Sequence, residues 1–265
     1  MRIPRLVPEH CLVHPGGSPT SVAPARLRSP LSRRATLACS LVAVAAIIGV
    51  NLALHILPST GLTLSIVAAG VLLLLGRASG LSWGQLGLGR AHLKPGLRWG
   101  GGVVLVVALV YLVGVLFPAT RTAFLDPRYH FSVPQALLTA FVMIPLGTVL
   151  LEEVAFRSVL WGMLSRHMSQ WRVLLASSSL FGLWHVFPSL SFASSNQAFA
   201  DAVPATGPAA TMIAVTGTVL FTALGGVVAG ALRHRSGSVL ASAGMHWATN
   251  SLGVLFGVLA WRMAG

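Results

Sequence analysis

The sequence predicts an all-α fold: a polytopic transmembrane helix bundle with about seven membrane-spanning helices, within a range of six to eight. Hydrophobic residues make up 55% of the 265-residue chain and charged residues 9%, and the mean hydropathy is +0.80. Windows of about 18 or more apolar residues follow one another along the chain, and this is the length that an α-helix needs to cross a bilayer. The period-two alternation of a membrane β-barrel is not found.

Seven segments carry these apolar windows, and each is expected to form one membrane span. The second segment is short and follows the turn sequence "PSTG", so it is predicted to form a helical hairpin with the first. The predicted spans are 36–57, 61–76, 99–117, 134–164, 172–188, 210–232 and 238–260.

The chain is predicted to divide into three regions. Residues 1–34 are rich in Pro, Ser and Arg and have no hydrophobic periodicity, so they are expected to form a disordered basic tail on the cytoplasmic side. Residues 35–133 are expected to hold the N-terminal membrane helices. Within them, the basic and amphipathic segment near 80–98 should lie on the cytoplasmic membrane surface. Residues 134–260 are expected to form the membrane core.

Positive charge predicts the orientation of the chain. With a cytoplasmic N-terminus, fourteen of the eighteen Lys and Arg residues lie on the cytoplasmic side. Arg157 lies within the membrane, and Arg121, Arg128 and Arg262 lie outside. Because the basic residues sit in short loops between apolar runs, they indicate membrane topology rather than a phosphate-binding face, and no nucleic-acid partner is expected.

One span carries charges where charge is costly. The stretch "LEEVAFRSVL" places Glu152, Glu153 and Arg157 inside the predicted span 134–164, although the whole chain has only five acidic residues. An ionised side chain at mid-bilayer costs a few kcal/mol, so such residues normally face the interior of the bundle and take a partner. Four-residue spacing puts Glu153 and Arg157 on one helix face, and Glu152 points about 100° away from Glu153.

Two later spans carry polar residues at a matching depth. His185 lies in "FGLWHVF", and His246 and Asn250 lie four residues apart in "GMHWATN". At 1.5 Å per residue, all these groups and the two glutamates lie about 12 to 20 Å below the cytoplasmic surface. Three separate helices are therefore expected to bring carboxylate, imidazole and carboxamide groups together, nearer the cytoplasmic side.

Two interpretations of the charged residues are open. Glu153 and Arg157 could be an ion pair that only holds helices together, and a lone membrane histidine is commonly a hydrogen-bond partner between helices. An ion pair needs only one carboxylate, however, and Glu152 is left over as a candidate general base. Glu152 with His185 could deprotonate a water, while His246 and Asn250 could donate hydrogen bonds to an oxyanion.

Three motifs in order resemble a known family. "EEVAFR" fits EExxxR, "FGLWH" fits FxxxH and "HWATN" fits HxxxN. Together they resemble the CAAX prenyl-protease and bacteriocin-processing (CPBP, or Abi) family of intramembrane proteases, over about residues 134–260. The segment "WGQLGLGR" upstream is similar to one that is common before the core in bacterial members.

The resemblance implies a membrane-embedded endopeptidase that cleaves a peptide or membrane protein by glutamate- and histidine-activated water. It implies catalytic roles for Glu152, His185, His246 and Asn250, with Glu153 and Arg157 supporting the site. A mechanism without metal is favoured, because a carboxylate-activated water needs none. The alternative is zinc held by Glu152, His185 and His246.

Other functions fit the same residues. A non-catalytic immunity or scaffold protein could keep the protease fold, and a proton-coupled transporter could use Glu and His as a relay. A transporter of this kind would be expected to contain inverted repeats, and such repeats are not evident in the sequence. High Ala, Gly, Arg and Leu usage suggests a GC-rich bacterial source, where a peptide or membrane-protein substrate is expected rather than a prenylated one.

Overall fold

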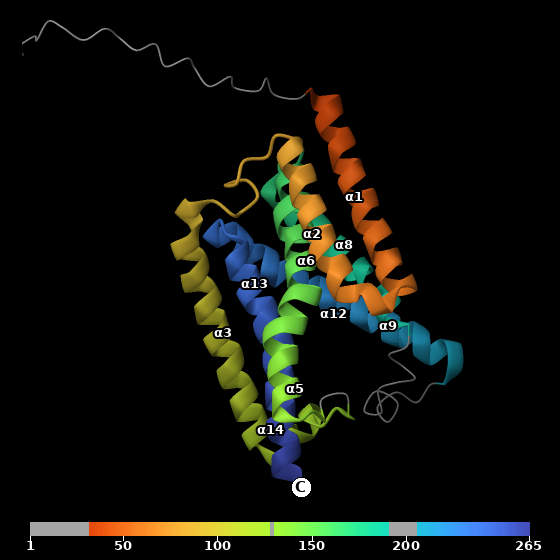
Figure 1. The fold of residues 1–265 in the computed structure, drawn as a ribbon, viewed down its shortest axis with the longest axis vertical. Helices are drawn as coiled ribbons and strands as arrows, with labels where there is room; N and C mark the ends of the chain where they lie inside the picture. The colour runs from red at the N-terminus through yellow and green to blue at the C-terminus, as the bar shows by residue number, and fades with distance from the viewer. Residues whose placement is uncertain (1–31, 128–129, 191–205) are drawn as a thin grey trace, which may run out of the picture. The chain divides into compact units, whose positions relative to one another are not determined.

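The computed structural model describes residues 32–127, 130–190 and 206–265. Most of the predicted tail, up to residue 31, lies outside the described residues. Within the described residues every regular element is helical, and residues Leu31–Gly265 form one compact unit. The predicted all-α class is confirmed (Figure 1).

The first two membrane helices form the predicted hairpin. Helix α1 (Arg33–Ile56) ends just before Pro58, whose ring favours an extended preceding residue. The 3₁₀ turn η1 (Pro58–Thr60) then leads directly into α2 (Gly61–Ala78). The two helices pack against each other, and the orange ribbons in Figure 1 show them running in opposite directions.

The basic segment near 80–98 does not form one separate surface helix. Its first part is a series of turns whose Leu81 and Leu86 are fully buried. It continues through the 3₁₀ turn η2 (Arg90–His92) into the start of α3 (Leu93–Leu116). The two leucines pack into the core because burial of their apolar side chains lowers the free energy of the folded chain.

Helix α3 is followed by two short elements and then by a long central helix. The short elements are α4 (Pro118–Arg121) and η3 (Thr122–Phe124). The central helix is continuous from Val133 to Leu164. It consists of α5 (Val133–Leu138), η5 (Thr139–Met143), η6 (Pro145–Val149), α6 (Leu150–Glu152), η7 (Glu153–Leu160) and α7 (Trp161–Leu164).

Three of these central segments, η5, η6 and η7, are π-helical. Pro145 cannot donate a backbone hydrogen bond, which disturbs the regular α-helical ladder at that point. π-Helical turns are rare and often mark functional sites. Here η7 begins at Glu153, and every residue of η7 is buried.

The remaining helices complete the bundle around the central one. They are α8 (Gln170–Trp184), α9 (Val186–Ser189), α12 (Gly207–Ser236), α13 (Val239–Trp247), η8 (Ala248–Leu252) and α14 (Gly253–Ala264). Gly237 ends α12 in the left-handed conformation (φ 68°), which reverses the chain into α13. In Figure 1, α12 runs obliquely to α13 and α14.

Five helices in the described residues are long and apolar enough to span a membrane, so the predicted number of seven is not confirmed. They are Arg34–Ile56, Pro58–Ala78, Arg90–Leu116, Val133–Leu164 and Gly207–Ser236. Predicted span 172–188 overlaps α8, which has only 15 residues, against about 20 for a full crossing. Predicted span 238–260 is helical too, but it carries the polar residues His246 and Asn250.

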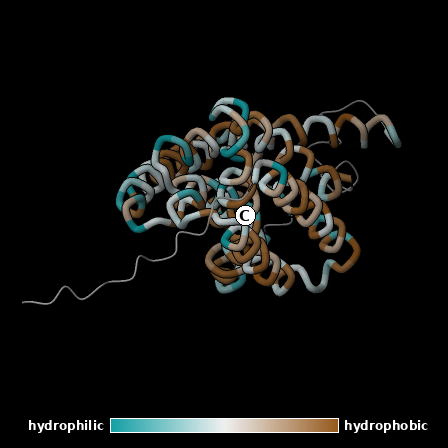
Figure 2. The backbone as a smooth tube through the Cα atoms, turned by 90° about the horizontal axis from the view of Figure 1, so that it is seen from above, coloured by the Kyte–Doolittle hydropathy of each residue, from teal (hydrophilic) through white to brown (hydrophobic). Residues whose placement is uncertain are grey.

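Large apolar side chains cover the outside of the five helices. Only 11% to 33% of the residues in their most apolar windows are buried, and Leu74 and Phe221 are 70% and 78% exposed. Figure 2 shows brown, hydrophobic residues along much of the peripheral helices. A surface this apolar is stable against lipid and not in water, so the chain is a multi-pass membrane protein.

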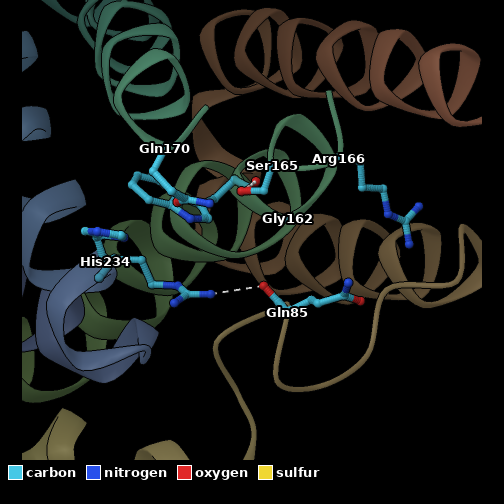
Figure 3. A pocket seen from close by; sticks show the side chains of 8 residues that line it. Gln85, Gly162, Ser165, Arg166, Gln170 and His234 are labelled. Carbon is cyan, nitrogen blue, oxygen red and sulfur yellow. Dashed lines mark hydrogen bonds between the residues drawn. The ribbon is translucent and has the colours of Figure 1, made fainter. Parts of the chain in front are cut away.

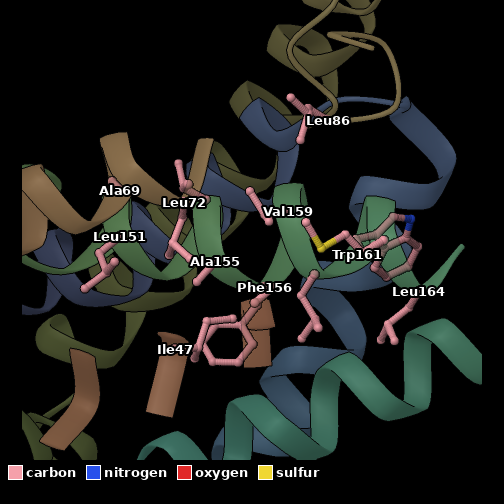
Figure 4. Close-up of a cluster of buried hydrophobic side chains, with 14 of the residues drawn as sticks. Ile47, Ala69, Leu72, Leu86, Leu151, Ala155, Phe156, Val159, Trp161 and Leu164 are labelled. Atoms are coloured by element: carbon pink, nitrogen blue, oxygen red, sulfur yellow. The ribbon is translucent and has the colours of Figure 1, made fainter. Parts of the chain in front are cut away.

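The tightest apolar packing surrounds the central helix. Figure 4 shows Phe156 and Val159 of η7 in one cluster with Ile47 of α1 and Leu72 of α2. On the other side of the bundle, α3 and α13 approach at Gly100 and Gly244, where a Cβ on Gly244 would lie 2.9 Å from the Gly100 Cα. Small residues allow such close approach between membrane helices. These contacts hold η7 and α13 in place, and both carry predicted site residues.

Candidate active site

The two glutamates of the central helix point into the bundle. Glu152 is the last residue of α6, Glu153 is the first residue of η7, and both side chains are buried. Arg157 lies one turn further along and is only 2% exposed. All three were expected to face the bundle interior, and the structure places them there.

Glu152 lies next to both predicted histidines. Its Oε2 atom is 3.6 Å from Nε2 of His246 and 4.0 Å from Nε2 of His185. His185 follows the end of α8, and His246 lies in α13. The structure therefore brings three predicted residues from three helices together. The Glu152 Oε2 atom is buried and has no hydrogen-bond partner among the described residues.

Glu153 holds His246 from the other side of the imidazole ring. Its Oε1 atom is 3.0 Å from His246 Nδ1 and 3.4 Å from an Arg157 guanidinium nitrogen. The Arg157 guanidinium also stacks on the Phe181 ring, 3.9 Å from its centre. The sequence alone suggested the Glu153–Arg157 pair, but the contact between Glu153 and His246 depends on how α13 packs against η7.

The other ring nitrogen of His185 is held by the backbone. His185 Nδ1 lies 2.8 Å from the Phe181 carbonyl oxygen. A carbonyl only accepts hydrogen bonds, so Nδ1 carries the proton and donates it. In the neutral ring, Nε2 is then a hydrogen-bond acceptor that faces Glu152.

Asn250 is the predicted site residue for which the structure gives no contact with the other site residues. It is half-buried in η8, and within the described residues its amide makes no hydrogen bond. The four-residue spacing from His246 was expected to place both side chains on one face. Because η8 is π-helical, a turn there contains more residues than an α-helical turn, and the expected alignment is altered.

A tryptophan that directly precedes His185 contacts the candidate base. Trp184 Nε1 donates a hydrogen bond to Glu152 Oε1 at 3.0 Å. The Trp184 carbonyl in turn accepts a hydrogen bond from the buried Asn51 amide, at 2.9 Å. Sequence reasoning missed Asn51, although a lone carboxamide in the apolar run "GVNLAL" was the available signal.

The Trp184→Phe variant is expected to lower both stability and activity. It removes the donor to Glu152 Oε1 but keeps an aromatic ring packed on Phe156. Leaving a buried acceptor without its donor costs about 1–3 kcal/mol. Thermal unfolding of the detergent-solubilised protein measures this loss. Trp171→Phe is the matched control, because Trp171 is 64% exposed; equal effects of the two variants would contradict the assigned role.

A cavity gives access to Glu152. It has a volume of about 270 Å³ and lies between α1, η6 and α9, lined by Asn51, His55, Thr148, Glu152, Trp184 and Phe187 among others. A second cavity of about 180 Å³ shares Asn51, Trp184 and Phe187 with it and is otherwise lined mostly by apolar side chains. Together they offer room for a water near Glu152 and for an extended apolar segment beside it.

The donor types at Glu152 suit a metal ion, but their arrangement does not form a ligand cluster. Two imidazoles and one carboxylate are a common zinc set, and both far imidazole nitrogens are held by partners, as in many metal sites. Among the described residues, however, no group of three or more His, Cys, Asp or Glu side chains is placed to hold an ion. The residue types at Glu152 therefore suit a zinc ion, but their positions do not form a zinc site.

Buried carboxylates that face imidazoles beside a cavity define a candidate hydrolytic site in a membrane bundle. The family model described as "Type II CAAX prenyl endopeptidase Rce1-like" matches residues 134–252. This match confirms the family that the three motifs suggested and contains all six predicted site residues. No curated protein and no solved structure gives a match. Residues 134–252 are thus similar to a family of membrane endopeptidases.

Proposed function

We propose that this protein is an intramembrane endopeptidase that hydrolyses a peptide bond by carboxylate-activated water. The observation that supports this most directly is the buried Oε2 atom of Glu152, which has no hydrogen-bond partner among the described residues and faces the Nε2 atoms of two histidines. A group placed in this way can accept a proton from a water that the histidines position. The match to a family of endopeptidases supports the same reaction type.

In the proposed mechanism, a water lies between Glu152 Oε2 and His185 Nε2. Each of these atoms accepts one hydrogen bond from the water. Glu152 takes the proton as the water oxygen bonds to the scissile carbonyl carbon, which gives a tetrahedral intermediate. When the C–N bond breaks, Glu152 returns this proton to the leaving amine, so the base is regenerated.

His246 and Asn250 are proposed to stabilise the oxyanion. His246 Nδ1 donates to the Glu153 carboxylate, so a second donor at Nε2 requires the doubly protonated imidazolium. Glu152 and Glu153 lie against both ring nitrogens and favour that charged form. Donors that face a developing oxyanion contribute strongly in a site that excludes water. Glu153 and Arg157 hold His246 in position and balance its charge.

The alternative, a zinc-dependent reaction, differs in its response to a chelator. Glu152, His185 and His246 would hold the zinc, which would supply Lewis-acid activation of a water. For the proposed carboxylate mechanism, protein dialysed exhaustively against EDTA should retain its full cleavage rate. A loss that added zinc restores would contradict the metal-free reaction.

The proposed substrate is a peptide or membrane protein that reaches Glu152 from the bilayer. The cavity beside Glu152 adjoins the apolar cavity between α1 and α8, so an apolar segment can lie next to the site. Prenylation of the substrate is not required by these features. We also propose a bacterial source of the CPBP, or Abi, type and a cytoplasmic N-terminus, which would place the site nearer the cytoplasmic side.

Comparative proteomics of membrane peptides tests the function. Cells that carry the wild-type protein are compared with cells that carry Glu152→Gln. We expect a set of cleaved peptides that occurs only with the wild-type protein, and these peptides identify the substrate. Identical peptide sets at equal amounts of membrane-inserted protein would contradict the protease and favour a non-catalytic scaffold. His185→Ala is the second variant and should give the same result as Glu152→Gln.

A further inference from the structure

A second polar cavity lies away from Glu152, where several helices end. It has a volume of about 340 Å³ and lies beside α7, the start of α8 and the end of α12. Figure 3 shows its lining, which consists of Gln85, Trp161, Gly162, Ser165, Arg166, Gln170, Arg233 and His234. This lining has two arginines and a histidine but no carboxylate, and nothing in the proposed reaction uses it.

Arg233 is the central feature of this cavity. Its side chain is only 5% exposed. The guanidinium donates to two backbone carbonyls, to Arg157 from Nε and to Gln85 from Nη2, both at 3.0 Å. Within the described residues it forms no ion pair with a carboxylate. A buried cation held only by neutral carbonyls lacks the counter-charge that normally offsets its desolvation.

The motif "WGQLGLGR" holds this guanidinium in place. Gln85 accepts from Arg233, and Gly87 lies directly against it, so that a Cβ on Gly87 would come within 2.6 Å of the Arg233 Cζ. Gly87 also has a positive φ of 75°, which side-chain-bearing residues rarely adopt. The turn therefore fixes a guanidinium with unused N–H donors at a cavity wall.

The height of the cavity in the bundle points to a membrane lipid. The candidate spans Val133–Leu164 and Gly207–Ser236 end beside it, so its lining lies where phospholipid headgroups meet the helices. Basic pockets between membrane helices at this level bind anionic headgroups. Guanidinium groups suit phosphate because they donate two parallel hydrogen bonds.

We propose that this cavity, which we call the Arg233 pocket, binds the phosphate of an anionic phospholipid. Arg233 and Arg166 provide the charge, and His234 and Ser165 provide further hydrogen-bonding groups. The bound lipid supplies the negative charge that the chain lacks at this point. Because the Arg157 carbonyl accepts from Arg233, the lipid would stabilise the helix that carries the candidate base. The proposal does not depend on catalysis.

Lipid binding to the full-length, delipidated protein in detergent tests the proposal. Short-chain phosphatidylglycerol, short-chain phosphatidylcholine and inorganic phosphate are added separately, and bound adducts are counted by native mass spectrometry. We expect one phosphatidylglycerol to be retained, with weaker retention of phosphatidylcholine. If inorganic phosphate binds as well and displaces the lipid, the pocket is a free-phosphate site and the lipid assignment is overturned.

Matched variants separate the Arg233 pocket from general surface charge. Arg166→Gln removes one lining charge, together with one hydrogen bond to the Ser79 carbonyl. It should weaken phosphatidylglycerol binding about fivefold, the loss expected for one basic residue near a headgroup. Arg172→Gln removes an exposed charge near the start of α8, outside the lining, and should bind as the wild type does. Equal binding by both variants would overturn the proposal. Arg233→Gln is the less suitable variant, because it also breaks two structural hydrogen bonds.

Discussion

Replacement of Glu152 by glutamine is expected to reduce cleavage of the substrate by about 10²–10⁴-fold, the usual contribution of a general base. Glutamine has nearly the same shape and keeps an oxygen that can accept the Trp184 hydrogen bond. It cannot take a proton from water. Steady-state cleavage by the purified variant, with a substrate identified by proteomics, measures the effect.

The matched control is Asp126→Asn, which removes one carboxylate charge outside the site. Cleavage by this variant should stay at the wild-type rate. Both variants should insert into membranes to the same extent, because neither change adds charge or bulk. A Glu152→Gln protein that cleaves at the wild-type rate would refute the assigned base, whatever its effect on folding.

Replacement of Arg157 by methionine is expected to destabilise the protein by about 3–5 kcal/mol, the usual cost of removing one partner from a buried ion pair. Arg157 is 2% exposed and lies 3.4 Å from Glu153. Without it, the Glu153 carboxylate keeps its contact with His246 but loses its guanidinium partner. The change also removes the stacking on Phe181. Denaturant or thermal unfolding in mixed micelles measures the loss.

Two further variants isolate the cause of this effect. Arg172→Met removes an exposed arginine and should change stability by less than about 0.5 kcal/mol. The double variant Glu153→Gln with Arg157→Met removes both charges, so it should be more stable than Arg157→Met alone. If the double variant is as unstable as the single one, packing of the arginine side chain matters more than its charge.

Much of the site was predictable because its signals are local. Two adjacent carboxylates and a guanidinium stand out in an apolar run, since each one is costly in lipid. Their shared depth with His185 and His246 follows from helix rise alone, and the separations of 3.6 and 4.0 Å in the structure agree with it. The role of each residue in catalysis stays a prediction.

Other features of the site could not be predicted from the sequence because they depend on packing between segments that are distant in the chain. Asn51 contacts Trp184 across 133 positions of sequence, and no periodicity indicates such a pair. Asn250 lies in the π-helical turn η8, whose hydrogen-bonding pattern depends on the packing of the whole bundle. The number of seven spans is not confirmed by the five long apolar helices of the described residues, because local hydropathy windows take no account of the shortness of α8.

The sequence alone determined that this is a helical membrane protein and which polar residues interrupt its apolar segments, because transfer of side chains into lipid depends on residue type and local order. Only the tertiary structure decided which atoms face one another: His246 against both glutamates, Trp184 against Glu152, and Arg233 in a cavity without a counter-charge. These contacts depend on the rotation and crossing of whole helices, which close packing sets through many contacts far apart in the chain.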